Sequence, residues 1–252
     1  MVESAYIIPG APSLALLADL HGWPYQDIIA SLARNKPEII CVAGDVIIGI
    51  RLETDASPLD GEENMLPFLE ECARIAPVFL SLGNHERILD AEDLTRIGNT
   101  GVTVLDNEWV RERGLVIGGL TSAYVMDYRR RRPLDSPRRY PRVLIPLTAP
   151  KPETGWMEEY TKAEGYHILL SHHPEYFPLV PKSVPLVLSG HAHGGQIRLF
   201  RRGLYAPGQG WMPKWTKGVY DGRLVVSAGL SNTASPVPRL FNPTEVVYAR
   251  PE

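Results

Sequence analysis

Short apolar runs alternate with amphipathic stretches along about the first hundred residues of the chain. The runs at 14–18, 39–43 and 78–82 have the length and composition of buried strands. Between them, apolar positions recur at helical spacing from Tyr25 to Leu32 and from Met65 to Cys72. Strands and helices that alternate in this way predict a largely parallel sheet with helices on its faces.

The pattern changes after about residue 100. Short strands are indicated at 102–105, 109–111 and 115–118, and we expect them to form hairpins with tight turns. The segment 128–142 is irregular, and helical character returns at 156–163. Further strands are indicated at 166–170, 186–188, 196–200, 224–226 and 246–249.

Polar side chains that can bind a metal follow five of the apolar strands. They are Asp19, His21, Asp45, Asn84, His172, His191 and His193. In open α/β sheets, ligands bind outside the carboxyl ends of the strands. If the five strands share a sheet, their ends therefore converge on one site. Six of the seven histidines lie at such ends, and only His167 lies within a strand.

The residue types of this set indicate which metals it would bind. Aspartate, asparagine and histidine without thiolate suit Mn, Fe, Zn or another first-row divalent ion, and argue against a structural cysteine site. Seven ligands are too many for one ion, whereas two ions that share a bridging carboxylate use them readily. Such a pair can activate a water and hold the oxygens of a phosphoryl group.

With these residues, the chain resembles the calcineurin-like metallophosphoesterase superfamily. Five motifs carry the resemblance, in the family's order: Asp19-Leu20-His21, Gly44-Asp45, Gly83-Asn84-His85-Glu86, His172-His173-Pro174 and Gly190-His191-Ala192-His193. The extension Gly194-Gly195-Gln196 and the tail Arg239-Leu240-Phe241-Asn242-Pro243 are similar to a bacterial, phosphodiesterase-like branch with the motif GHxHGGQ. The resemblance implies the α/β fold class, as a four-layer α/β/β/α sandwich of two mixed sheets flanked by helices.

The resemblance also implies a role for each motif residue. Asp19, His21 and His193 would hold one divalent ion; Asn84, His172 and His191 would hold a second; and Asp45 would bridge them. A metal-bridging hydroxide would attack phosphorus, and His85 would assist the leaving group rather than bind metal. Glu86 has no role that the sequence supports. His173 is equally compatible with supporting a ligand and with pointing elsewhere.

Two segments are candidates for substrate binding. Seven arginines fall within residues 128–142, among them Arg129, Arg130 and Arg131, and arginine binds phosphate with two parallel hydrogen bonds. The alternative, which the sequence favours slightly, is that these arginines belong to a solvated charged loop. Residues 205–217 contain Trp211 and Trp215 with nearby lysines, which could stack a base, touch lipid or pack a loop.

Composition sets the remaining expectations. A chain of 252 residues with 44% hydrophobic and 22% charged residues is typical of a globular protein, and nothing divides it, so we expect a single domain over 1–252. A net charge of −3 supports neither a stable nucleic-acid complex nor a DNA nuclease. We expect Cys41 and Cys72 to be reduced core thiols. No signal peptide or transmembrane segment is indicated, so we expect a cytoplasmic location and leave peripheral membrane contact open.

These observations favour a metal-dependent phosphoesterase that acts on diesters or pyrophosphates. Its substrate would be a small phosphorylated molecule, either a nucleotide or a lipid-derived diester. The preference for diesters comes from the resemblance alone. A phosphomonoesterase with the same site and a metal-binding scaffold without catalysis are the alternatives.

Overall fold

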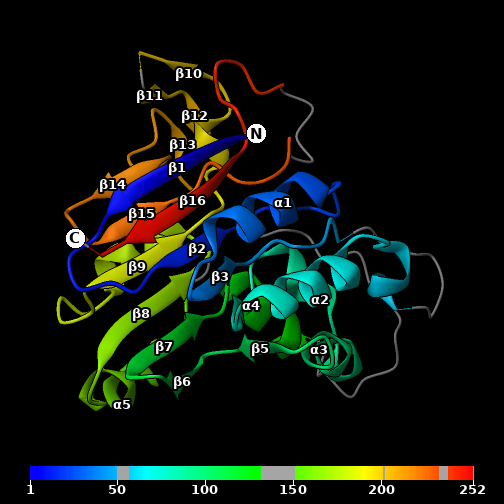
Figure 1. The fold of residues 1–252 in the computed structure, drawn as a ribbon, viewed down its shortest axis with the longest axis vertical. Helices are drawn as coiled ribbons and strands as arrows, with labels where there is room; N and C mark the ends of the chain where they lie inside the picture. The colour runs from blue at the N-terminus through cyan, green and yellow to red at the C-terminus, as the bar shows by residue number, and fades with distance from the viewer. Residues whose placement is uncertain (50–56, 132–150, 201, 233–237, 252) are drawn as a thin grey trace.

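Two six-stranded mixed sheets form the centre of the molecule (Figure 1). The computed structural model describes residues 1–49, 57–131, 151–200, 202–232 and 238–251. The first sheet has the order β1 (Val2–Ile7), β16 (Glu245–Arg250), β2 (Leu14–Leu17), β3 (Ile39–Ala43), β4 (Val78–Ser81) and β5 (Val102–Leu105). All neighbouring pairs in it are parallel except β16 with β2. Figure 1 shows the first and last strands, β1 and β16, side by side.

The second sheet has a parallel centre and antiparallel edges. Its order is β14 (Gly218–Tyr220), β15 (Leu224–Val226), β9 (Leu186–Ser189), β8 (Tyr166–Ser171), β7 (Leu115–Leu120) and β6 (Glu108–Glu112). The β6–β7 pair is a hairpin closed at Arg113 and Gly114, which both have positive φ. A hairpin turn at Asp221-Gly222, where both residues have positive φ, joins β14 to β15.

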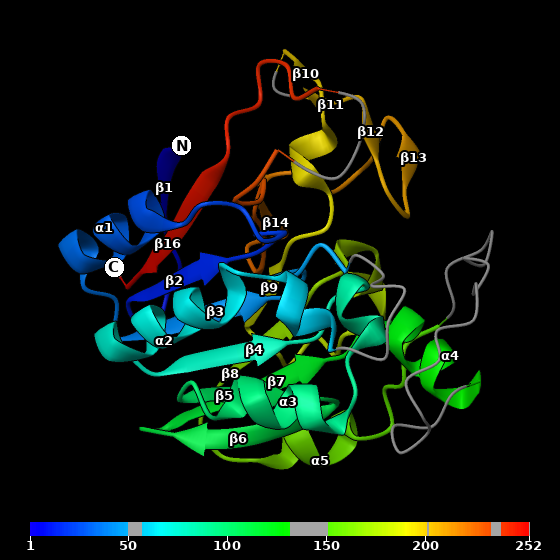
Figure 2. The same cartoon turned by 90° about the vertical axis from the view of Figure 1, so that its right-hand side faces the viewer.

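Helices cover the outer faces of the two sheets (Figure 2). Helices α1 (Gln26–Asn35), α2 (Met65–Ile75) and α3 (Ala91–Gly98) share a hydrophobic core with the first sheet. Helix α5 (Met157–Lys162) and the 3-10 helix η3 (Pro174–Leu179) share another core with the second sheet. Asp90 caps α3 through a reciprocal capping box with Asp93.

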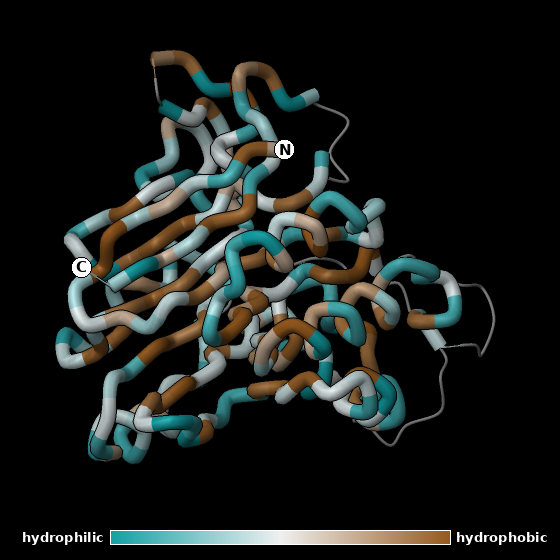
Figure 3. The backbone as a smooth tube through the Cα atoms, viewed as in Figure 1, coloured by the Kyte–Doolittle hydropathy of each residue, from teal (hydrophilic) through white to brown (hydrophobic). Residues whose placement is uncertain are grey.

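A third core lies between the two sheets. Leu16, Cys41 and Phe79 of the first sheet lie in it, together with Ile168 and Leu188 of the second. Successive side chains of a strand point to opposite faces, so the neighbours of these residues reach the helix-covered cores. The central strands of the two sheets are therefore apolar throughout rather than alternating, as Figure 3 shows in brown. The predicted four-layer α/β/β/α arrangement is confirmed.

Small elements connect these layers. They are η1 (Pro58–Gly61), η2 (His85–Ile88), α4 (Ala123–Arg131), η4 (His193–Gly195), β10 (Arg198–Leu199), β11 (Arg202–Gly203), β12 (Tyr205–Ala206) and β13 (Gly210–Trp211). Strand pairs β10–β11 and β12–β13 are short antiparallel hairpins. No helix within the described ranges is both long and apolar enough to span a membrane.

The structure corrects three expectations from the sequence. The five strands with polar ends do not share one sheet, because β2, β3 and β4 belong to the first and β8 and β9 to the second. Residues 102–105 form no hairpin with 108–112, since β5 pairs in parallel with β4. Residues 128–131, expected to be irregular, are the last turn of α4. The rest of the arginine-rich segment, 132–142, lies outside the described residues.

Candidate metal centre

The strands that precede the polar residues end on the side of the molecule where α4 lies (Figure 2). Side chains from the two sheets meet there. His172 Nε2, beyond β8, lies 3.0 Å from Asp45 Oδ2, beyond β3. His193 Nε2 lies 3.7 Å from Asp19 Oδ1, and His21 Nε2 lies 4.0 Å from the same oxygen. The predicted convergence therefore occurs, although it takes place across the seam between two sheets.

Four groups of side chains could each hold a metal ion. They are Asp19 with His21 and His193; Asp19 with Asp45 and His172; His21 with Asp45 and His85; and His172 with His173 and His191. Asp19 and Asp45 each belong to two groups, so a carboxylate that two ions share is compatible with the geometry. Asn84, at the start of η2 and next to His85, has its Oδ1 buried without a hydrogen-bond partner among the described residues.

The backbone is strained at these residues. Asp19, His21, Asp45, His191 and His193 have φ of 57°, 48°, 54°, 63° and 45°. Residues other than glycine rarely adopt this left-handed region, and such residues cluster at functional sites. Backbone hydrogen bonds hold the conformation, since Asp19 N–H donates to Gly44 O at 3.1 Å and His21 N–H to Asp45 O at 3.2 Å.

Two glycines allow the loops to approach the carboxylates. A Cβ on Gly83 would lie 2.2 Å from Asp45 Oδ1, and one on Gly190 would lie 2.7 Å from Asp19 Oδ2. Both positions therefore exclude any larger side chain. At Gly190 the approach is used, because the next N–H, of His191, donates to both oxygens of Asp19 at 3.2 and 3.1 Å.

The histidines are oriented by backbone carbonyls. His172 Nδ1 lies 2.7 Å from Ala43 O, and His21 Nδ1 lies 3.2 Å from Ile47 O. A ring that donates from Nδ1 presents the lone pair of Nε2. In both residues Nε2 is buried and, within the described part of the chain, has no aligned hydrogen-bond partner; the same holds for Asn84 Oδ1 and His193 Nδ1.

These buried atoms are a test of whether the site fits a cation. Buried polar atoms are nearly always satisfied, so a cluster of unpaired lone pairs indicates a missing positive partner. The donors are imidazole nitrogen, amide oxygen and carboxylate, a set that suits first-row divalent ions. The residues present therefore fit the divalent metals expected from the sequence.

The charges of the cluster support the same interpretation. Burial, with the nearby Asp45 charge, raises the pKa of Asp19 to about 7. Burial opposes the charge on His172, yet Asp45 and Asp19 beside it raise its pKa to about 10. Burial alone would raise the pKa of Asp45, but His172 and His85 hold it well below its usual range. In the metal-free protein, protonated His172 therefore supplies the positive charge that the carboxylates require.

His85 lies at the mouth of the cluster. Its side chain is 23% exposed, against 0% for His172, so it is open to solvent. His85 Nδ1 lies 2.6 Å from Ile48 O, and Nε2 lies 3.8 Å from Asp45 Oδ2. One imidazole nitrogen is thus fixed by the backbone while the other faces the centre. This placement suits proton transfer, and the grouping with His21 and Asp45 also suits metal binding.

Glu86 is a structural residue of the site that the sequence did not reveal. Its buried carboxylate accepts hydrogen bonds from the N–H groups of Gly83, Asp45 and Val46 at 2.7, 2.9 and 2.9 Å. These groups belong to the loops after β4 and β3. Glu86 therefore joins the loop that carries Asp45 to the loop that carries Asn84.

The segment 239–243 near the C-terminus holds another loop of the site, the one that carries His193. Asn242 Nδ2 donates to His193 O at 2.7 Å and to Gln196 O at 3.2 Å. The guanidinium of Arg239 donates to Asn242 O, Ser231 O and Ala228 O at 2.8 to 2.9 Å. The tail therefore fixes the loop that carries His193, which gives a physical reason for its presence in the sequence pattern.

The candidate substrate residues are dispersed. Arg129 is paired with Asp106 at 2.5 Å and only 14% exposed, whereas Arg130 is exposed on α4; the side chain of Arg131 lies outside the description. Trp211 is 77% exposed and contacts Tyr205, and Trp215 packs edge-on against Phe177. The pairing of Arg129 and the packing of Trp215 are structural contacts, so Arg130 and Trp211 are the more accessible of the four.

Comparison with known proteins identifies relatives of the chain. The family model for calcineurin-like phosphoesterases matches residues 12–195. A putative metallophosphoesterase of Caenorhabditis elegans is 27% identical over 95% of this chain and 48% of its own length. Uncharacterized metallophosphoesterases of Campylobacter jejuni and Helicobacter pylori (strain J99) are 30% and 26% identical over 91% and 94% of this chain, and 54% and 59% of their own lengths. The chain therefore spans about half the length of these curated relatives.

Proposed function

We propose a phosphodiester hydrolase function for this chain, which belongs to the calcineurin-like phosphoesterase family. The family supports metal-dependent hydrolysis of a phosphoester. The observation that carries the proposal for this chain is the group of buried ligand atoms on His21, Asn84 and His193 that lack a hydrogen-bond partner among the described residues, together with His172 and two carboxylates that lie within reach of one another. A diester preference rests on similarity to the phosphodiesterase-like branch.

In this proposal the site holds two divalent ions. Asp19, His21 and His193 would bind one, and Asn84, His172 and His191 the other, with Asp45 between them. When bound, such ions lower the pKa of a water and offset negative charge on phosphoryl oxygens. The chain's own contribution is to hold the ligands in position through Ala43 O, Ile47 O and the strained loops.

His85 is proposed to donate a proton to the leaving oxygen. Because Ile48 O lies 2.6 Å from Nδ1, a proton on Nε2 is the one directed to the centre. Its partial exposure lets the ring exchange protons with solvent after each turnover. The small phosphorylated substrate would be a nucleotide or a lipid-derived diester, with Arg130 and Trp211 as its accessible candidate contacts.

We expect His85→Asn to lower kcat by about 10²- to 10⁴-fold, the usual contribution of a general acid. Asparagine cannot transfer a proton near neutral pH, but it can still donate to Ile48 O. Steady-state kinetics with Mn²⁺ would measure the loss, and the ion content of the variant would serve as its control. Loss of a bound ion together with activity would assign His85 to the metal ligands instead.

We expect the affinity for Mn²⁺ to rise with pH. Metal ligands must be deprotonated, and in the free protein the pKa of His172 is raised to about 10 and that of Asp19 to about 7. Between pH 7 and 9 one proton is displaced, so affinity gains about tenfold per pH unit. Below pH 7 Asp19 is also protonated and the dependence becomes steeper. Calorimetry in buffers of different ionisation enthalpy would count the protons; an affinity independent of pH would contradict this.

Hydrolysis of a chromogenic phosphodiester and its matching monoester tests the proposed function. The protein is stripped of metal and then restored with Mn²⁺. Metal-dependent cleavage that is faster for the diester than for the monoester supports the proposal. Preference for the monoester would assign the same site to a phosphomonoesterase. If the protein binds metal but hydrolyses neither chromogenic substrate, nor any nucleotide or lipid-derived diester, the non-catalytic scaffold would be favoured.

A further inference from the structure

Glu175 lies beside the proposed second ion, and the proposed function assigns it no role. It is the second residue of η3, three positions after His172. Its Oε1 lies 3.2 Å from His173 Nδ1 and 3.8 Å from His191 Nε2. The side chain is 15% exposed, and its Oε2 is buried without a hydrogen-bond partner among the described residues. A carboxylate this enclosed needs a positive or donating partner.

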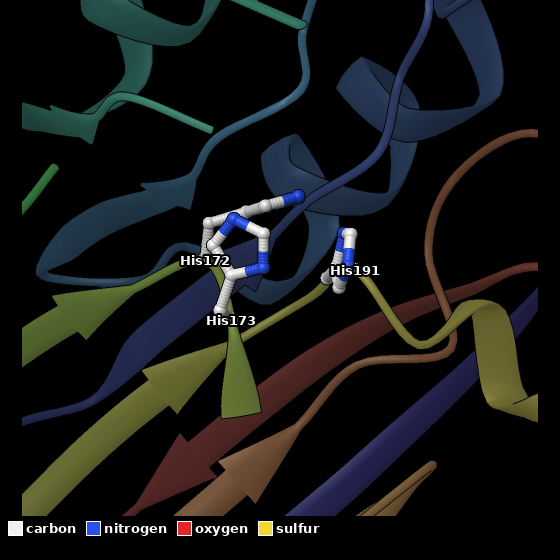
Figure 4. Close-up of side chains that lie close together, drawn as sticks. All are labelled: His172, His173 and His191. Carbon is white, nitrogen blue, oxygen red and sulfur yellow. The ribbon is translucent and has the colours of Figure 1, made fainter. Parts of the chain in front are cut away.

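His173 holds this carboxylate from behind. The ring of His173 is fully buried, and its Nε2 lies 2.8 Å from Ser122 Oγ while Nδ1 faces Glu175. Ser122 is itself anchored by its N–H to Leu82 O at 2.9 Å. Figure 4 shows the rings of His173 and His191 close together, with centroids 4.1 Å apart. A chain of contacts therefore runs from Ser122 through His173 and Glu175 to His191.

The turn of the β12–β13 hairpin closes the same space from outside. Gly208 has φ of +70°, and a Cβ on it would lie 2.0 Å from Glu175 Oε1 and 3.5 Å from His191 Nε2. Glu175 and Gly208 together enclose Nε2 of His191. With Glu175 and Gly208 next to Nε2, we assign Nδ1 of this ring to the metal ion.

We propose that Glu175 is a positioning residue whose carboxylate accepts the Nε2–H of His191 and so leaves the Nδ1 lone pair directed to the second ion. This inference rests on the proposed two-ion function. A metal-binding histidine commonly donates its other N–H to a carboxylate, which fixes the tautomer and the orientation of the ring. The present contact of 3.8 Å is longer than a hydrogen bond, so the proposal requires this contact to shorten when the metal binds.

Titration of metal-free protein with Mn²⁺ alone tests the inference. We expect wild type to bind two ions, and Glu175→Ala to bind the second about 10- to 100-fold more weakly with the first unchanged. Glu175→Gln retains an oxygen that can accept the Nε2–H, so its second affinity should lie between those two. Glu164→Ala, at an exposed glutamate before β8, is the control and should match wild type.

Each result decides one point. Wild-type affinities in Glu175→Ala would overturn the inference while leaving the two-ion proposal intact. If Glu175→Gln bound the second ion as weakly as Glu175→Ala does, the inference would also be overturned, because the carboxylate would then act through its charge. Fewer than two ions in wild type would overturn the two-ion function and this inference with it. Gly208→Ala displaces the carboxylate from the other side, so the same weakening is expected there.

Discussion

Asp45→Asn should lower kcat/KM for a phosphodiester by at least about 10³-fold, the upper range for loss of one electrostatic stabiliser in an active site. Asp45 shares one candidate metal group with His21 and His85 and another with Asp19 and His172. Its Oδ2 lies 3.0 Å from His172 Nε2 and 3.8 Å from His85 Nε2. Asparagine retains an oxygen for the backbone N–H of His85, which donates to Oδ1 of Asp45 at 2.9 Å. It removes the negative charge that two ions would share.

Steady-state kinetics at saturating Mn²⁺, together with the bound ions per chain, would measure this effect. We expect the Asp45→Asn variant to remain folded and to lose at least one ion. Asp60→Asn is a matched control, because Asp60, on η1, is half exposed and is paired with Arg96 of α3. The control should retain wild-type kinetics. A folded Asp45→Asn variant with full metal-dependent activity would show that the bridging assignment is wrong.

Glu86→Ala should be the most destabilising single change at the site. It leaves the N–H groups of Gly83, Asp45 and Val46 buried and unpaired, at a cost of about 1–3 kcal/mol each. The sum is comparable to the whole free energy of unfolding of an ordinary domain, about 5–15 kcal/mol. The variant should therefore unfold at a much lower urea concentration, or fail to fold.

Urea denaturation of metal-free protein would measure this loss of stability. Glu86→Gln retains one acceptor oxygen, so we expect it to fold, with a smaller loss and a weaker affinity for Mn²⁺ as the two loops separate. Glu70→Ala, at a half-exposed residue of α2, should change the free energy of unfolding by less than about 0.5 kcal/mol. Equal stability of Glu86→Ala and Glu70→Ala would refute the structural role of Glu86.

The strands and the polar residues that follow them could be predicted because both depend on local pattern. The run at 39–43 is apolar at every position, and Asp45 follows it directly. The assignment of strands to sheets could not be predicted. Strands of both sheets are covered on both faces, so β3 and β8 have the same pattern although they lie in different sheets.

Elements without an apolar run could not be predicted, because their local pattern does not differ from that of a loop. Strand β1, with the sequence VESAYI, lies at the edge of the first sheet and is mostly exposed, so its pattern resembles that of a loop. Residues 128–131 contain charged side chains that mask the last turn of α4. The single domain and the cytoplasmic location stay predictions.

The supporting residues of the site depend on contacts between distant segments. Glu86 is one position from His85 in sequence, yet its partners include Asp45 and Val46 on another loop. Glu175 follows the His172-His173-Pro174 motif, but its nearness to His191 and Gly208 arises only from the fold. The available signal was an acidic residue beside a ligand motif, and the sequence alone could not distinguish a buried acid there from a surface charge.

The position of the centre on the seam between two sheets has a consequence for how the protein folds. Asp19 and His193 belong to segments far apart in the chain, so their contact closes a long loop and comes late in folding. We therefore expect metal ions to take little part in the early collapse of the chain. They stabilise the native state by mass action, so that added ions slow unfolding far more than they speed refolding. Resistance to unfolding thus depends on metal supply even though the route to the fold does not.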